Sequence, residues 1–198
     1  MEKLKNLLEM IFNLFKKDDI PFRKLLNTNN WFNYKRFYRK ITKEKEFKVF
    51  VEIGSWKGHS TRYLGKLLKD RDIVIYAIDL FDMTYKKYDS LEKKYMFEIF
   101  NYNIKKLNNI EPIKSISWEA SEGFNNASVD FVFIDADHTY SSVKKDIQSW
   151  LPKVKKGGII SGHDYFNPCG VKQAVDEIFS DKVEFYDKCW FVRILWKK

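Results

Sequence analysis

A loop with two glycines, placed directly after an apolar run, constrains the fold of this chain more than any other feature. The run 49–51 leads into Glu52-Ile53-Gly54-Ser55-Trp56-Lys57-Gly58, and a helical stretch follows. Glycine lets the backbone approach a ligand closely, and the first turn of a helix presents free N–H groups. Asp79 ends the next apolar run, where a carboxylate is placed to hold the neighbouring hydroxyls of a ribose. The pattern predicts an α/β sheet that binds a nucleotide-containing cofactor.

The spacing of the glycines narrows the choice of cofactor. Dinucleotide-binding folds use a tight Gly-x-Gly-x-x-Gly loop, whereas this chain has the spacing acid-x-Gly-x-x-x-Gly. It lacks the third glycine that brings a helix close to a pyrophosphate. S-adenosylmethionine contains no pyrophosphate, so the loop favours S-adenosylmethionine over NAD.

Predicted strands and helices alternate along most of the chain, which is typical of a doubly wound parallel sheet. We expect strands at 47–53, 73–79, 112–117, 129–134, 158–161, 183–186 and 190–195. We expect helices at 2–16, 33–43, 60–69, 90–108, 140–150 and 170–180. A tight turn at Asp187-Lys188 joins the last two strands, which must therefore be antiparallel. The predicted fold is α/β, with a mostly parallel seven-stranded sheet that ends in a C-terminal antiparallel hairpin.

The N-terminal segment is predicted to be helical and separate from the catalytic unit. Apolar residues recur at three- and four-residue steps between positions 4 and 15. The amphipathic helix that results either caps the domain or forms the seam of a homodimer. We divide the chain into an N-terminal cap or substrate segment, 1–45, and an S-adenosylmethionine-binding catalytic domain, 46–198. Either the N-terminal segment or the region 81–94 is a candidate lid.

The chain carries a formal net charge of +9, and most of the excess precedes the cofactor loop. Residues 1–48 contain 13 Lys and Arg against 6 Asp and Glu, and aromatic residues are interleaved with them at 31–38. Such a segment is either a nucleic-acid surface or an amphipathic helix whose basic side chains face water, and we favour the helix. No apolar run reaches the roughly 18–20 residues of a membrane span. Cys169 and Cys189 are expected to be free thiols in a cytoplasmic protein.

The three histidines occupy equivalent positions relative to the predicted strands. His59, His138 and His163 each come just after a predicted parallel strand. Ligands of open α/β sheets bind beyond the carboxyl ends of the strands, so these side chains are expected to face one site. Acids stand beside two of them, in Asp135-Ala136-Asp137-His138 and His163-Asp164. The pattern predicts that Asp135, His163 and Asp164 converge on a divalent cation, while Asp137 fits equally well as a helix N-cap.

From residue 31 to the C-terminus, the chain resembles the small class I S-adenosylmethionine-dependent methyltransferases. The stretches that carry this resemblance are VEIGSWKGHST (51–61), AID (77–79), DFVFIDADHTY (130–140) and GGIISGHDY (157–165). Residues 170–177 and 189–193 add to it. The resemblance is closest to the group with macrolide-sugar O-methyltransferases, and it is similar at more distance to catechol and caffeoyl-CoA O-methyltransferases.

The resemblance implies roles for individual residues. The cofactor contacts that it implies are Glu52, Gly54, Ser55, Trp56, Gly58, Ser60, Asp79, Leu80, Ser117, Trp118 and Asp135. Within this set, Asp79 takes the position that binds the ribose hydroxyls, and Ser117 and Trp118 take positions beside the adenine. The implied metal ligands are Asp135, His163 and Asp164. His138 occupies the place of the general base, and Asp137 is the alternative base.

The expected metal depends on His163, because better-known relatives carry a carboxylate at that position. Mg²⁺ prefers oxygen ligands, whereas imidazole suits Mn²⁺ and softer ions. Either His163 leaves the cation to Asp135 and Asp164, or the ion is softer than Mg²⁺, or the enzyme works without a metal. We expect a divalent cation, Mg²⁺ or Mn²⁺.

The expected activity is the S-adenosylmethionine-dependent methylation of a hydroxyl on a small molecule or sugar, since a vicinal diol would chelate such a cation. A nucleic-acid methyltransferase is one alternative, but the chain lacks the Asn/Asp-Pro-Pro-aromatic motif that holds an exocyclic amine. The other alternative is a non-catalytic relative of the methyltransferases, which binds the cofactor but transfers no methyl group. Such a protein would need only the glycine loop and Asp79.

Overall fold

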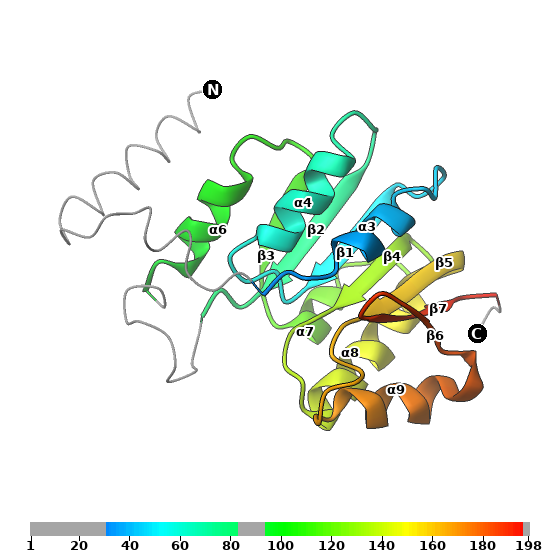
Figure 1. The fold of residues 1–198 in the computed structure, drawn as a ribbon. Coiled ribbons are helices and arrows are strands. Elements are labelled where there is room, and N and C mark those ends of the chain that lie inside the picture. The colour runs from blue at the N-terminus through cyan, green and yellow to red at the C-terminus, as the bar shows by residue number, and fades with distance from the viewer. Residues whose placement is uncertain (1–30, 83–93, 196–198) are drawn as a thin grey trace.

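A seven-stranded sheet forms the centre of the molecule, with the strand order β3-β2-β1-β4-β5-β7-β6 (Figure 1). The computed structural model describes residues 31–82 and 94–195. Its strands are β1 (Val49–Ile53), β2 (Val74–Asp79), β3 (Ile110–Lys114), β4 (Val129–Ile134), β5 (Val154–Gly162), β6 (Glu184–Tyr186) and β7 (Cys189–Arg193). Strands β1 to β5 pair in parallel, and β7 pairs antiparallel with both β5 and β6. The predicted fold class, including the C-terminal hairpin, is confirmed.

Helices cover both faces of the sheet. They are α3 (Lys35–Ile41), α4 (His59–Leu67), α6 (Met96–Ile104), α7 (Ser117–Ser121), α8 (Tyr140–Trp150) and α9 (Val171–Phe179), with short 3-10 turns at Leu151–Lys153 and Ser180–Lys182. Residues of α3, α4 and α6 share one hydrophobic core with the sheet, and residues of α8 and α9 share the other. The chain therefore forms three layers, with helices above and below the sheet (Figure 1).

Alternation along β4 explains why the sheet is buried on both sides. Successive side chains of a strand point to opposite faces. Phe131 and Phe133 belong to the core under α3 and α4, whereas Val132 and Ile134 belong to the core under α8 and α9. All four side chains are at most 4% exposed, so this central strand is apolar on both faces.

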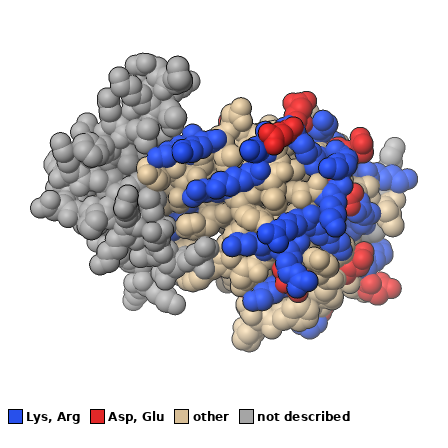
Figure 2. Space-filling model, turned by 45° about the horizontal axis from the view of Figure 1, so that its top comes forward, with Lys and Arg blue, Asp and Glu red and all other residues tan. Residues whose placement is uncertain are grey.

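Helix α3 packs against the sheet through one apolar face. Tyr34, Phe37, Tyr38 and Ile41 are buried, while the Lys and Arg side chains between them lie mostly toward solvent. Figure 2 shows Lys and Arg spread over one face of the molecule. This arrangement confirms the amphipathic interpretation for residues 33–43. The predicted helix 2–16 lies outside the described residues, and both the division at residue 45 and the homodimer stay predictions.

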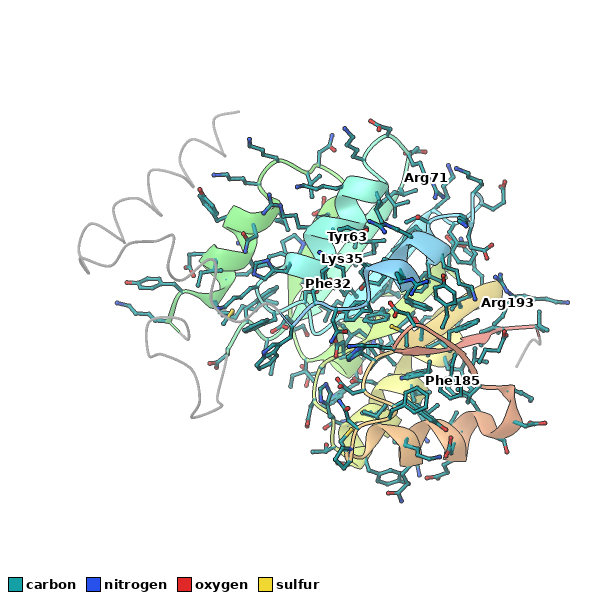
Figure 3. All side chains as sticks on the ribbon, viewed as in Figure 1. Phe32, Lys35, Tyr63, Arg71, Phe185 and Arg193 are labelled. Carbon is teal, nitrogen blue, oxygen red and sulfur yellow. The ribbon has the colours of Figure 1, made fainter. Side chains whose placement is uncertain are left out.

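Arginine side chains fasten the turn that follows α3. The Arg71 guanidinium donates hydrogen bonds to the backbone carbonyls of Thr42, Glu44 and Phe47. Arg193 of β7 forms an ion pair with the Glu44 carboxylate at 2.5 Å. Figure 3 labels both arginines. These contacts tie the end of α3 to α4 and to the sheet, and so fix the position of a helix whose first turn reaches the candidate site.

Several element boundaries differ from the sequence prediction. Strand β3 occupies Ile110–Lys114 instead of 112–117, and Ser117–Ser121 form α7, which was not predicted. The Trp150 indole donates to the Ser117 hydroxyl at 2.9 Å, so a contact with α8 holds this short helix. Strand β5 extends over Val154–Gly162, beyond the predicted 158–161. Of the predicted helix 90–108, the structure places α6 at Met96–Ile104, and residues 83–93 of the candidate lid lie outside the described residues.

Candidate active site

A cavity of about 1590 Å³ opens at the carboxyl ends of β1, β2, β4 and β5. His59, His138 and His163 all line it, as the common position of the three histidines predicted. A pocket for a drug-sized ligand usually measures about 300–1,000 Å³. The cavity is therefore large enough for two molecules side by side.

The loop after β1 is packed against the loop after β4. Gly54 has φ +86°, and a Cβ atom there would lie 2.1 Å from the Asp135 carbonyl oxygen. The Asp135 N–H donates to the Ile53 carbonyl at 2.9 Å, and the Gly54 N–H donates to the Ile78 carbonyl at 2.9 Å. Glycine is required at this position because the backbone is left-handed and a neighbouring backbone leaves no room for a side chain.

Asp79 joins the glycine loop to the end of β2. The Trp56 N–H donates to Asp79 Oδ2 at 2.8 Å, and the Phe81 N–H donates to Asp79 Oδ1 at 2.7 Å. Burial raises the pKa of Asp79, and these two hydrogen bonds oppose the rise. A carboxylate has about four lone-pair sites. The described residues donate to two of these sites, which leaves two for hydroxyl groups in the cavity.

Nine of the eleven predicted cofactor residues line the cavity, and Glu52 and Gly58 do not. The Glu52 carboxylate is buried and accepts hydrogen bonds from the hydroxyls of Tyr38, at 2.5 Å, and Thr61. Burial raises the pKa of Glu52, and these two hydrogen bonds lower it, so that the pKa stays above its ordinary value. Gly58, at φ +77°, caps α4, and a Cβ there would lie 2.8 Å from the Phe100 ring. The structure thus places these two residues behind the cavity wall, where they support the loop.

Asp135, His138 and Asp164 form a cluster at one side of the cavity. One potential ligand atom from each lies within 4.8 Å of the others. His138 Nε2 is 3.1 Å from Asp164 Oδ2 and 3.5 Å from Asp135 Oδ1. The hydrogen bond with Asp135 raises the pKa of His138, although partial burial lowers it. Two carboxylates and an imidazole suit a divalent cation such as Mn²⁺.

The predicted ligand His163 lies beside this cluster and not among its three members. Its Nδ1 is 3.1 Å from Asp164 Oδ2, and its Nε2 is 3.1 Å from the Asn33 side-chain oxygen. Both ring nitrogens therefore face protein groups. The Asp164 backbone is left-handed, at φ +59°. That His163 binds a cation stays a prediction. The imidazole that lies close to both carboxylates is that of His138, the predicted base.

Asp137 accepts hydrogen bonds at the start of α8. Its carboxylate receives the Thr139 N–H at 3.1 Å, the Thr139 hydroxyl at 3.1 Å and the Ser142 hydroxyl at 2.7 Å. Partial burial raises the pKa of Asp137, but the hydrogen bonds lower it by more, so the pKa lies below its ordinary value. The side chain lines the cavity. The N-cap of α8 is Thr139, so the prediction that Asp137 caps this helix is wrong: its carboxylate binds the cap residue and the Ser142 hydroxyl instead.

Several site residues were not predicted from the sequence. The Tyr34 hydroxyl donates to Asp135 Oδ2 at 3.0 Å, and the Trp31 ring stacks on Trp56 with centroids 5.0 Å apart. Asn33 contacts His163, as described above. All three residues belong to the predicted cap or substrate segment 1–45, for which the sequence indicated no individual site residue. The spacing of Tyr34, Phe37, Tyr38 and Ile41 marks the inward face, but it does not show that Tyr34 reaches the loop after β4.

Residues 51–165 match the family model described as "Methyltransferase domain". Among curated proteins, the chain is similar to an uncharacterized protein of Acanthamoeba polyphaga mimivirus, with 28% identity over 149 residues. That alignment covers 71% of this chain and 63% of the viral protein, so the chain spans less than two thirds of that relative's length.

Solved structures share the fold. The O-methyltransferase NovP matches with a TM-score of 0.64 and 18% identity, over 84% of this chain and 82% of NovP. An O-methyltransferase from Bacillus cereus, solved in complex with S-adenosylhomocysteine, matches with a TM-score of 0.60 and 16% identity, over 95% of this chain and 90% of that one. At these identities the similarity establishes the arrangement of the sheet and helices. Among the described residues, no helix has the length and apolar content that a bilayer span requires.

Proposed function

The chain belongs to the methyltransferase-domain family, and on this premise we propose that it transfers the methyl group of S-adenosylmethionine to a hydroxyl oxygen of a small molecule, with help from a divalent cation. One observation carries the proposal. The backbone of Asp135 packs against Gly54 of the cofactor loop, while its side chain belongs to the Asp135–His138–Asp164 cluster. A methyl donor on the loop and an acceptor on the cluster would therefore be neighbours in one cavity.

The glycine loop and Asp79 suit the donor. The N-terminus of α4 favours a negatively charged group, such as the carboxylate of the methionine part. The free lone pairs of Asp79 suit the two ribose hydroxyls. Ser117 and Trp118 also line the cavity, and the Lys145 ammonium lies 4.0 Å from the centre of the Trp118 ring, a contact that stabilises the ring. This ring offers a flat surface to a nucleobase.

Asp135 and Asp164 are the residues that would hold a cation. A bound divalent ion would polarise the acceptor hydroxyl, lower its pKa and fix its position. Tyr34 orients Asp135 through its hydroxyl, and His163 orients Asp164. A vicinal diol, as in a sugar or a catechol, presents two oxygens to such a pair of carboxylates and so fits the cluster better than a single hydroxyl does.

His138 is placed to receive the proton. Its imidazole projects between the two carboxylates and is about 41% exposed, so an acceptor can reach it from the cavity. In the transfer step, the acceptor O–H bond breaks toward the imidazole while the oxygen bonds to the methyl carbon. The bond from that carbon to sulfur breaks at the same time and leaves S-adenosylhomocysteine. General bases of this kind typically contribute about 10²–10⁴-fold to the rate.

The first test is the binding of S-adenosylhomocysteine, measured by calorimetry. We expect binding to the wild type and to Asp181→Asn, which removes an exposed carboxylate that is not part of the cavity lining. Asp79→Asn should weaken binding at least about tenfold, because an amide cannot accept from two hydroxyls as a carboxylate does. If the wild type shows no binding, or if Asp79→Asn binds as tightly as Asp181→Asn, the proposed donor site is wrong.

The second test addresses the cation and the acceptor. Titration of free Mn²⁺, followed by its electron paramagnetic resonance signal, should show one site in the wild type that Asp164→Asn removes. Transfer of a radiolabelled methyl group should then favour a diol over the same compound with one hydroxyl already methylated. Equal transfer to both compounds, or Mn²⁺ binding that survives Asp164→Asn, would refute metal-assisted methylation of a chelating diol.

A further inference from the structure

Helix α8 carries a buried carboxylate at the nucleobase end of the cavity. Asp146 is 2% exposed and lines the cavity, together with Ser142 one turn earlier on the same helix. Ser117 and Trp118 of α7 line the same region. Ser117 forms a hydrogen bond with Asp146, and Lys145, the residue before Asp146, contacts the Trp118 ring, so the acid lies near Trp118.

The hydrogen bonding of Asp146 is incomplete. Its Oδ1 is buried and has no hydrogen-bond partner within residues 31–82 and 94–195. Asp130, another buried acid, has hydrogen-bond donors for both of its oxygens. Its carboxylate accepts from the backbone N–H groups of Lys48 and Val49 and from the Lys155 ammonium. A buried acceptor without a donor destabilises a protein by about 1–3 kcal/mol, and more when it is charged. Such an atom next to a cavity indicates a donor that arrives with a ligand.

The electrostatics of Asp146 agree with this role. Burial raises its pKa to about 6, and a hydrogen bond from Ser117 opposes the rise. The carboxyl group is therefore ionised at pH 7.5 and above, and it is a strong hydrogen-bond acceptor beside the cavity. A ligand group that donates an N–H there would form a charge-assisted hydrogen bond in a region shielded from water.

We propose that Asp146 accepts a hydrogen bond from the exocyclic amine of the cofactor's adenine and so selects adenine over bases with a carbonyl at that position. This inference rests on the proposed function, because it assumes that S-adenosylmethionine occupies the cavity. Trp118 would stack on the face of the adenine ring, and Asp146 would accept a hydrogen bond from the amine at the edge of that ring. With a base that has a carbonyl oxygen in place of the amine, the Asp146 carboxylate and this oxygen would both be acceptors and would repel each other. Such a base would therefore bind more weakly.

The test compares S-adenosylhomocysteine with its deaminated analogue, S-inosylhomocysteine, which carries a carbonyl in place of the amine. Calorimetry at pH 8 on the wild type should show that the adenosyl compound binds roughly 10- to 100-fold more tightly, as expected for a hydrogen bond to a charged group. Asp146→Asn should weaken the adenosyl compound and strengthen the inosyl compound, because the amide N–H₂ can donate to the carbonyl. Glu122→Gln is the matched control, since it removes an exposed carboxylate beside α7 and should leave the ratio unchanged.

Each outcome decides between the two claims. A wild type that binds both compounds equally overturns the role of Asp146 and leaves the proposed function intact. The same holds if Asp146→Asn weakens both compounds by one factor, which would indicate a purely structural acid. A wild type that binds neither compound refutes the proposed function, and the inference fails with it. Should Asp146→Asn not fold, the wild-type ratio alone still decides, because discrimination by less than about threefold is too small for a charge-assisted hydrogen bond.

Discussion

Gly54 and Gly157 form a natural pair for measuring how strongly the cofactor loop is constrained. Both have φ +86°, so an alanine at either position suffers the same left-handed backbone. A Cβ on Gly54 would lie 2.1 Å from the Asp135 carbonyl oxygen and 2.7 Å from the Ala136 Cα. A Cβ on Gly157 would meet no atom of the described residues within 4 Å. The difference between the two variants therefore isolates the steric clash.

The expected magnitudes follow from these contacts. A left-handed alanine costs about 1–2 kcal/mol, and this is the whole expected loss for Gly157→Ala. Gly54→Ala must also separate two backbone segments by on the order of 1 Å, which disrupts the hydrogen bonds of the Gly54 and Asp135 N–H groups. At about 0.5–1.5 kcal/mol for each bond, the total loss for Gly54→Ala is about 2–5 kcal/mol.

Urea unfolding and calorimetric binding of S-adenosylhomocysteine measure the two effects. Gly157→Ala should keep wild-type affinity, because β5 at that point lies away from the cavity lining. Gly54→Ala should lose at least about 100-fold in affinity, since displacements of about 1 Å can cost that much at a positioned site. Equal losses of stability in the two variants, with affinity preserved in both, would refute the claim that the Asp135 backbone makes glycine necessary at position 54.

Three other predictions concern the cluster and the helix beside it. Tyr34→Phe should weaken Mn²⁺ binding about 10- to 100-fold, as the loss of a hydrogen bond to a metal ligand typically does, and Tyr63→Phe, which removes another buried hydroxyl, should leave the Mn²⁺ titration unchanged. Asp137→Asn should lower the free energy of unfolding by about 1 kcal/mol in urea, because it weakens the hydrogen bonds to Thr139 and Ser142, and it should retain methyl transfer. His138→Asn should reduce the transfer rate about 10²–10⁴-fold, and a larger rate loss in Asp137→Asn than in His138→Asn would make Asp137 the base. The pKa of Asp146 is raised from 3.8 to about 6, so the folded state binds the proton more tightly than the unfolded state does, and the stability that this proton supplies is lost as pH rises through 6. From pH 5 to pH 8 the wild type should therefore lose about 1 kcal/mol relative to Asp146→Asn, and a difference that stays constant with pH in urea unfolding would show that Asp146 is ionised in the folded protein throughout.

The sequence was sufficient for the sheet because the sheet depends on local patterns. Apart from Asp130, the residues of β4 are apolar, as a strand buried on both faces requires, and the two acids that follow the strand mark its end. The turn at Asp187-Lys188 predicts the antiparallel β6–β7 pair in the same way. The helix α7 was missed because five residues are too few for a periodic pattern, and a contact from Trp150 holds the helix in place.

The candidate site was predictable only in outline. The positions of His138, His163 and Asp164 after parallel strands indicate that these residues share one edge of the sheet. They do not show which ring lies between the carboxylates, because that depends on the direction of each side chain from its loop. The structure turns His138 toward Asp135 and Asp164 and turns His163 toward Asn33, which is 130 residues away in the chain.

By itself, the sequence determined the fold class, the glycine loop after β1 and the edge of the sheet where the chemistry is expected, because periodicity, glycine spacing and strand ends are properties of neighbouring residues. Only the tertiary structure decided how that edge is assembled. Tyr34 supports Asp135 across 101 residues of chain, Glu52 is held by Tyr38 behind the cavity wall, and Asp146 lies beside the cavity with an oxygen that no described residue satisfies. Such contacts depend on how the packed layers bring distant side chains together, and no local pattern records that geometry.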